Sequence, residues 1–193
     1  MVRPLWIIVA AIQLSRHDVA SEDAERWAAA LQKQAAAHDF DPFTGVAIIT
    51  KESGFQPDAI SRSGEDYGLA QIRARYVGAC KNDADPLRRP SAACRAVRRQ
   101  LLDPEQNIAM MAELITRNRN LCRKKTGTAL FHQWLASYQG RNYPKRNRWC
   151  QPGEGTWEVI AYRRWLIDKT SRLRPPTEKP TGDDSKPSKP NAE

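Results

Sequence analysis

The chain has 193 residues, enough for one domain of about 150 residues with a hydrophobic core and short tails, but too few for two such domains. It carries 31 Lys and Arg against 22 Asp and Glu, a formal net charge of +9. This surplus predicts attraction to an anionic polymer, whether cell wall, membrane surface or nucleic acid, and charge alone does not choose among the three.

The first 21 residues have the layout of a secretory signal peptide. Arg3 supplies a short positive region, residues 4–14 an apolar stretch, and Val19-Ala20-Ser21 a small-residue cleavage site. The stretch is shorter than the roughly 20 residues that span a bilayer. We therefore predict a signal peptide at residues 1–21, cleaved near Ser21. The alternatives are an N-terminal helix packed on the domain or an uncleaved anchor.

Downstream, capping signals and apolar periodicity predict six helices, at residues 22–37, 42–53, 92 to 101 or 102, 104 onward, 128–138 and 156–169. Asp41-Pro42 and Asp103-Pro104 mark two starts, because each places Pro at the first helical position after an Asp N-cap. Residues 54–76 are rich in turn formers and predict a loop or small hairpin.

The C-terminal residues 171–193 contain five prolines and no apolar periodicity. Such a segment cannot bury enough apolar surface to offset its ordering entropy. We predict a disordered Pro/Lys-rich tail there, which leaves residues 22–170 as the folded domain.

Four cysteines, an even number with none in a C-x-x-C pair, predict two disulfides rather than a zinc or thioredoxin-type redox site. We favour the sequential pairing, Cys80 with Cys94 and Cys122 with Cys150, which is one of three possible connectivities. Free buried thiols are the alternative. Disulfides and a signal peptide together predict a periplasmic or secreted protein.

One carboxyl, Glu52, falls near the end of the predicted helix 42–53, a few residues after the apolar pair Ile48-Ile49. A carboxyl there lies at the negative end of the helix dipole, and burial would further penalise its charged form. Cleavage of a glycosidic bond requires such a protonated carboxyl, because the leaving group is poor. Glu52 is thus a candidate general acid, and a solvated helix-terminal Glu is the alternative.

The residues around Glu52 resemble a known family. Glu52-Ser53-Gly54-Phe55 and Gly68-Leu69-Ala70-Gln71-Ile72 are similar to the motifs of the soluble lytic transglycosylase (SLT) family of the lysozyme-like superfamily. Ala136-Ser137-Tyr138-Gln139-Gly140 is similar to the family's Ala-Tyr-Asn-Ala-Gly signature, with Gln139 in place of Asn. The resemblance covers residues 22–170. It implies a mainly α, α+β lysozyme-like fold: a helical bundle around a glycan-binding cleft with a small loop or β-hairpin region.

The resemblance also implies a chemistry. Members of the family cleave the MurNAc-GlcNAc β-1,4 bond of peptidoglycan with one Glu, which acts first as acid and then as base and leaves a 1,6-anhydro-MurNAc end. Carried over by motif, Glu52 is the catalytic residue, and Gln71 and Tyr138 contact the sugar. Gln139 and Ser61 are further substrate-binding candidates, and Ser53 has a supporting role.

Asp66 is the residue that complicates this expectation. Glycoside hydrolases of the usual kind use two carboxylates, so Asp66 supports an alternative, a muramidase on the same fold. Its other interpretation is a turn-stabilising Asp in a supporting role. The Asp66-Tyr67 loop is more similar to the secretion-system and phage branches of the family, which makes a secretion or cell-envelope machine a candidate partner.

A different class of function is suggested by basic runs interleaved with Trp and Tyr: a non-catalytic binder of anionic polymers or nucleic acid. The catalytic pattern favours the enzyme, so we expect peptidoglycan glycan strands as the partner, no nucleic acid, and a monomer. His17, His38 and His132 lack metal-ligand spacing, so neither metal nor cofactor is implied.

Overall fold

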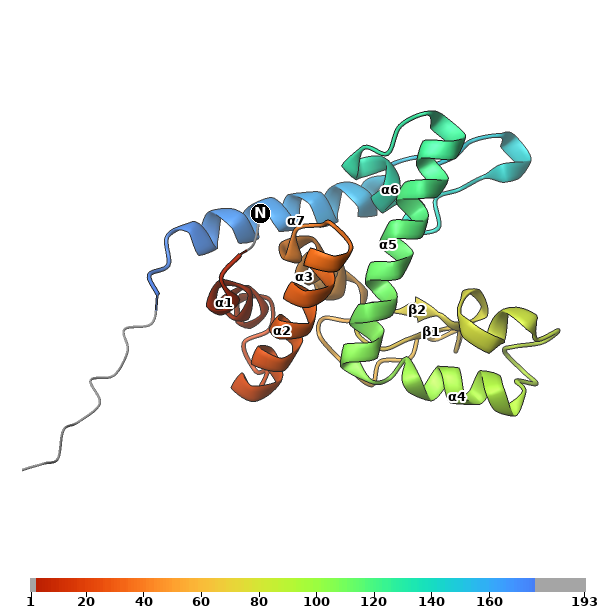
Figure 1. Cartoon of the computed structure of the whole chain (residues 1–193), viewed down its shortest axis with the longest axis horizontal. Helices are drawn as coiled ribbons and strands as arrows, with labels where there is room; N and C mark the ends of the chain where they lie inside the picture. The colour runs from red at the N-terminus through yellow and green to blue at the C-terminus, as the bar shows by residue number, and fades with distance from the viewer. Residues whose placement is uncertain (1–2, 176–193) are drawn as a thin grey trace, which may run out of the picture.

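The computed structural model describes residues 3–175, and they are mainly α-helical, as predicted (Figure 1). Two short antiparallel strands, β1 (Asp66–Tyr67) and β2 (Ile72–Arg73), form the hairpin expected in the turn-rich region. The α-helices are α1 (Leu5–Ser15), α2 (Ser21–Ala37), α3 (Pro42–Glu52), α4 (Ala92–Gln100), α5 (Pro104–Thr126), α6 (Phe131–Tyr138) and α7 (Glu154–Ser171). Three 3-10 helices are η1 (Ala74–Tyr76), η2 (Gly78–Asn82) and η3 (Pro144–Arg146).

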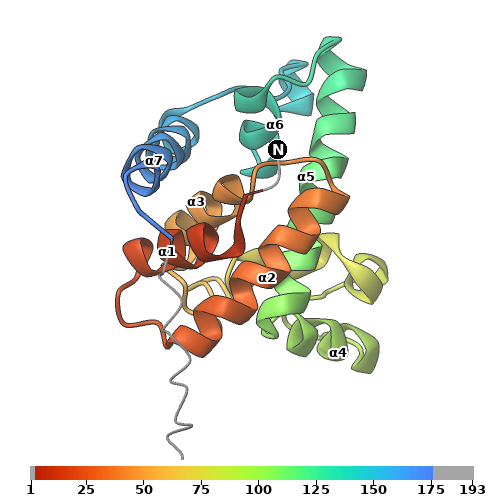
Figure 2. The same ribbon diagram turned by 60° about the vertical axis from the view of Figure 1, so that its left-hand side comes forward.

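The long helix α5 stands between two parts of the molecule, with α1, α2, α3 and α7 on one side and the hairpin, η2 and α4 on the other (Figure 1). α3 lies among its neighbours and packs against α7, α1 and α2 (Figure 2). Its eight consecutive residues 42–49 are all buried, which their apolar composition allows. Only the C-terminal end of α3, with Lys51 and Glu52, reaches the surface.

The capping residues confirm the predicted helix starts. Asp41 accepts a hydrogen bond from the Phe43 amide at 3.1 Å, and Asp103 accepts one from the Gln106 amide at 2.9 Å. The Asp41 carboxylate also pairs with Arg3 and Arg163 at 2.7 and 2.6 Å. The start of α3 is therefore tied both to the N-terminal segment and to α7.

Two helix starts differ from prediction by more than one residue. α6 begins at Phe131 rather than at residue 128, because the Gln133 side chain accepts hydrogen bonds from the Thr128 hydroxyl and the Leu130 amide and holds the preceding residues as a cap. α7 begins at Glu154, two residues before the predicted start at residue 156. Here the Thr156 hydroxyl accepts a hydrogen bond from the Gly153 amide at 3.3 Å. Local capping by side chains decides both boundaries.

The N-terminal segment forms a helix that packs in the core. Ile8, Ala11 and Ile12 of α1 are fully buried against neighbouring helices, and the Ser15 hydroxyl accepts a hydrogen bond from Tyr162 of α7 at 3.0 Å. This arrangement is the packed N-terminal helix that the sequence left as an alternative to a signal peptide. Cleavage near Ser21 would remove all of these contacts, and it stays a prediction that sequencing of the mature N-terminus tests.

Substitution in α1 tests its place in the folded protein. We expect Ile12→Ala to lower the free energy of unfolding by about 2–4 kcal/mol, because it leaves a cavity in the core. Leu14→Ala on the same helix is the control, because Leu14 is 43% exposed. The measurement is denaturant unfolding of the full chain. Equal, negligible effects of both substitutions would contradict the packing of α1 on the domain.

Both predicted disulfides are present, Cys80–Cys94 and Cys122–Cys150, with sequence separations of 14 and 28 residues. The first closes the segment between the hairpin and α4, and the second joins α5 to the segment before α7. Two disulfides fit an oxidising compartment. No helix within residues 3–175 is long and apolar enough to cross a membrane. Of the predicted disordered tail, residues 176–193 lie outside the described residues. Its first residue, Ser171, is the last residue of α7 and so belongs to the folded domain.

Candidate active site

Glu52 is the last residue of α3, and its carboxyl is partly buried. Burial, and after it the negative charge of Asp66, raise the pKa of Glu52 from 4.5 to about 7. The position at the carboxyl end of the helix also disfavours the charged form. A large fraction of Glu52 is therefore protonated at neutral pH, which is the state that a general acid requires.

The turn after Glu52 is held by residues from distant parts of the chain. Phe55 is 1% exposed and stacks on Trp27 of α2 with ring centroids 5.9 Å apart. Gly54 and Phe55 both have left-handed backbone angles, with φ of 59° and 61°. Arg16, just after α1, donates a hydrogen bond to the Gly54 carbonyl at 3.1 Å. Sequence reasoning missed Arg16, because no local pattern connects it with this turn.

The segment Tyr67–Gln71 is fixed to α5 by one buried side chain, Asn107. Its amide oxygen accepts the Ala70 amide at 2.7 Å, and its amide nitrogen donates to the carbonyls of Tyr67 and Leu101 at 2.8 and 2.7 Å. A Cβ on Gly68 would clash with the Leu101 carbonyl and the Asn107 amide. The glycine of the motif is therefore required by this close approach.

Gln71, a predicted sugar contact, has its donors occupied within the protein. Its Nε2 donates to the carbonyls of Ala59 and Gly68 at 3.1 and 3.0 Å. With both amide hydrogens used in this way, the Gln71 side chain offers a substrate its Oε1 as an acceptor. Its backbone φ of 46° shows that the turn itself is constrained.

Tyr138 comes from the end of α6, far along the chain, and lies close enough to Glu52 to be affected by its charge. Burial first, and then the Glu52 carboxylate, raise the pKa of the Tyr138 phenol well above its usual value. Its hydroxyl donates to the Ala70 carbonyl at 3.3 Å, so it contacts the same motif segment. The hydroxyl stays protonated at physiological pH, and because its one hydrogen is directed to Ala70, its oxygen can serve a substrate as an acceptor.

Gln139, a predicted substrate-binding residue, makes hydrogen bonds to the start of α7, and its contact with a sugar stays a prediction. Its Nε2 donates to the Gly155 carbonyl at 3.3 Å, and its Oε1 accepts from the Thr156 hydroxyl at 2.8 Å. Both ends of the amide thus join α6 to the start of α7. Ser53, the supporting residue, has its hydroxyl 3.5 Å from the Ile49 carbonyl of α3, and its own carbonyl accepts the Gln56 amide at 3.3 Å.

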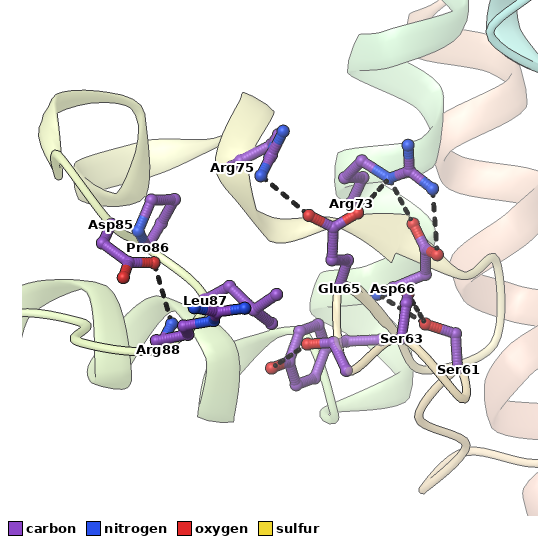
Figure 3. A network of polar contacts seen from close by, with 12 residues as sticks. Ser61, Ser63, Glu65, Asp66, Arg73, Arg75, Asp85, Pro86, Leu87 and Arg88 are labelled. Atoms are coloured by element: carbon purple, nitrogen blue, oxygen red, sulfur yellow. Dashed lines mark hydrogen bonds and ion pairs between the residues drawn. The ribbon is translucent and has the colours of Figure 1, made fainter.

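Asp66 belongs to a network of charges on the hairpin (Figure 3). Arg73, directly opposite in the ladder, contacts the Asp66 carboxylate at 2.8 and 3.3 Å. Arg75 pairs with Glu65 at 2.8 Å. The Ser61 hydroxyl accepts the Asp66 backbone amide at 3.1 Å. Ser61 therefore shapes the hairpin that carries Asp66.

A cavity of about 630 Å³ lies elsewhere, at the N-terminal end of α3, among Arg3, Asp41, Trp134 and Arg163. α3 has 11 residues, which at about 1.5 Å per residue puts some 16 Å between its two ends. This cavity is therefore separate from Glu52, and we do not connect it with bond cleavage.

The described residues thus bring Glu52, Asp66, Gln71 and Tyr138 into one neighbourhood, built from α3, the hairpin and α6. The family model of the transglycosylase SLT domain matches residues 29–143, more than half of the chain and all four of these side chains. No solved structure matches the chain. The chain therefore belongs to the transglycosylase SLT domain family, the lytic transglycosylases of the lysozyme-like superfamily.

Proposed function

We propose that this protein cleaves the MurNAc-GlcNAc β-1,4 bond of peptidoglycan and leaves 1,6-anhydro-MurNAc ends, with Glu52 as the only acid and base. Family membership supports a peptidoglycan lytic transglycosylase-type function. The observation that carries the finer proposal is the Glu52 carboxyl, whose pKa of about 7 suits proton donation and proton recovery at the same pH.

In the proposed reaction Glu52 donates its proton to the glycosidic oxygen as the bond to C1 breaks. Glu52, now a carboxylate, takes the proton of the C6 hydroxyl while that oxygen bonds to C1. Tyr138 contributes a protonated hydroxyl near the reacting sugar, and Gln71 contributes Oε1 as acceptor for a substrate N–H. No water is consumed, and the acid is regenerated at the end of the cycle.

A muramidase remains the second candidate, because Asp66 lies within electrostatic reach of Glu52. Usual hydrolases use such a second carboxylate as nucleophile or general base. The test is digestion of purified peptidoglycan, with the muropeptide ends identified by mass. Anhydro ends support the transglycosylase, whereas reducing ends, heavier by one water, would establish the muramidase instead.

The pH dependence of the reaction provides a further prediction. Because the charge of Asp66 raises the pKa of Glu52, we expect Asp66→Asn to lower that pKa. An enzyme loses activity when its general acid loses its proton, which happens as the pH rises through the pKa of that acid. The alkaline limb of the kcat/KM profile should therefore lie at lower pH in Asp66→Asn than in the unmodified protein. Asp58→Asn, an exposed carboxylate in the same region, is the control. An unmoved or raised limb in Asp66→Asn would contradict the electrostatic coupling.

We also propose that the protein acts in the periplasm or outside the cell, in keeping with its two disulfides. Peptidoglycan is then its polymeric partner, and the excess of basic residues favours adhesion to the anionic wall. A secretion or cell-envelope machine stays a candidate partner on the basis of the Asp66-Tyr67 loop.

A further inference from the structure

Asp66 is a second carboxylate near Glu52, and it is paired with an arginine of the same hairpin. Asp66 and Arg73 are direct cross-strand partners in β1 and β2. Arg73 Nε lies 2.8 Å from one carboxylate oxygen of Asp66, and an Nη lies 3.3 Å from the other. This two-point contact gives the pair a defined geometry as well as opposite charges.

A second ion pair, between Glu65 and Arg75, lies next to the Asp66–Arg73 pair. Arg73 Nε lies 3.7 Å from Glu65, and Glu65 is itself bound to Arg75 at 2.8 Å (Figure 3). The Asp66 side chain is only 18% exposed, so few water molecules can reach it. The two Arg73 N–H groups occupy two of the roughly four acceptor sites of the carboxylate and fix its orientation.

We propose that Arg73 determines the product of the reaction: by pairing with Asp66, it prevents that carboxylate from activating water and leaves Glu52 to act alone. This inference rests on the proposed transglycosylase function. The carboxylates that Arg73 pairs with are Asp66 and Glu65, and it acts here through Asp66, so we treat it as a positioning residue rather than a catalytic one.

The two outcomes differ in their atoms. With Asp66 paired, the C6 hydroxyl oxygen bonds to C1 and its proton passes to Glu52. With Asp66 free, a water oxygen bonds to C1 while Asp66 accepts one proton of that water, and Glu52 gives its proton to the leaving oxygen. Asp66 then releases its proton to solvent and Glu52 takes one up, so that one water is consumed and a reducing end forms.

The test is Arg73→Gln, with the ratio of reducing to anhydro ends measured by mass after digestion of peptidoglycan. We expect that ratio to rise at least about tenfold, since a general base contributes about 10²-fold or more. Arg75→Gln is the matched control, because Arg75 and Arg73 are equally exposed, at 45% and 44%, and Arg75 pairs with Glu65 alone. The control should leave the ratio unchanged.

The double variant Arg73→Gln/Asp66→Asn identifies the base, and we expect it to restore anhydro products. Reducing ends that persist in the double variant would overturn the inference, as would an unchanged ratio in Arg73→Gln. Both kinds of end are produced by the same folded fraction of the variant, so partial misfolding lowers the total yield but does not change their ratio. Arg73→Lys retains the charge but loses the two-point contact, and it should give an intermediate ratio.

The two proposals fail in different ways. Reducing ends from the unmodified protein would refute the proposed transglycosylase function. Anhydro ends from both the unmodified protein and Arg73→Gln would refute only the role of Arg73.

Discussion

Glu52→Gln is expected to lower turnover on peptidoglycan by about three orders of magnitude, because the amide can neither donate nor take back the proton that bond cleavage requires. The measurement is the rate of release of soluble muropeptides from purified peptidoglycan. Glu158→Gln is the matched control: Glu158 is an exposed carboxylate that pairs with the neighbouring Lys51 at 3.3 Å, and its loss should leave turnover unchanged. Comparable activity of Glu52→Gln and the unmodified protein would show that the acid is another residue.

The same substitution should stabilise the fold at alkaline pH. The folded-state pKa of Glu52 is about 7 and its ordinary value is 4.5. Below pH 4.5, Glu52 is protonated in both the folded and the unfolded protein, so it does not lower the free energy of unfolding. As the pH rises from 4.5 to about 7, the unfolded protein loses this proton more readily than the folded protein. The resulting loss in the free energy of unfolding is complete above pH 7, at up to roughly 3 kcal/mol.

We therefore expect denaturant unfolding at pH 8 to show a more stable Glu52→Gln protein. The gain in the free energy of unfolding should disappear at pH 4. A gain that is independent of pH, or a loss of stability, would contradict the raised pKa of Glu52. The combination of lost activity and increased stability would also exclude misfolding as the reason for inactivity.

Asn107→Ala has the second large expected effect, a loss of about 3 kcal/mol in the free energy of unfolding. The substitution takes the side-chain partner away from one buried backbone N–H and two carbonyls, at about 1 kcal/mol each. The affected groups belong to Tyr67, Ala70 and Leu101. Because the same segment positions Gln71 and Asp66, kcat should fall even under conditions in which the variant remains folded.

The control for this substitution is Asn120→Ala, an exposed position on the same helix α5. It removes an equal side chain without breaking a buried hydrogen bond, so its unfolding midpoint and kcat should match those of the unmodified protein. Near-equal stability of the two variants would show that Asn107 does not hold the Tyr67–Gln71 segment.

Much of the fold could be predicted from local chemistry. Asp41-Pro42 and Asp103-Pro104 start helices because a capping carboxylate and a fixed φ act within a few residues, and the structure confirms both starts. The start of α6 was misplaced by three residues, because the Gln133 side chain caps it from within the helix. Helix boundaries that depend on such side-chain hydrogen bonds are the hardest feature to predict from a sequence.

The candidate site was predictable as a set of residue types but not as a set of contacts. The motif residues Glu52, Gln71 and Tyr138 do lie in one neighbourhood. Gln139, predicted from the same motif, joins α6 to α7, and its contact with substrate stays a prediction. Its two hydrogen-bond partners come from another helix, and no pattern around residue 139 reveals them.

Caps, apolar periodicity and motif spacing are local properties, so the family, the helical architecture and the single carboxyl at a helix end could all be predicted from the residue order. The environment of each polar group could not, because it depends on the packing of distant segments. In the folded protein, burial raises the pKa of Glu52 to about 7, Asp66 is paired with Arg73, and Asn107 holds the motif segment. Burial, charge proximity and hydrogen-bond partners depend on residues that are distant in the chain, so folding alone brings them together.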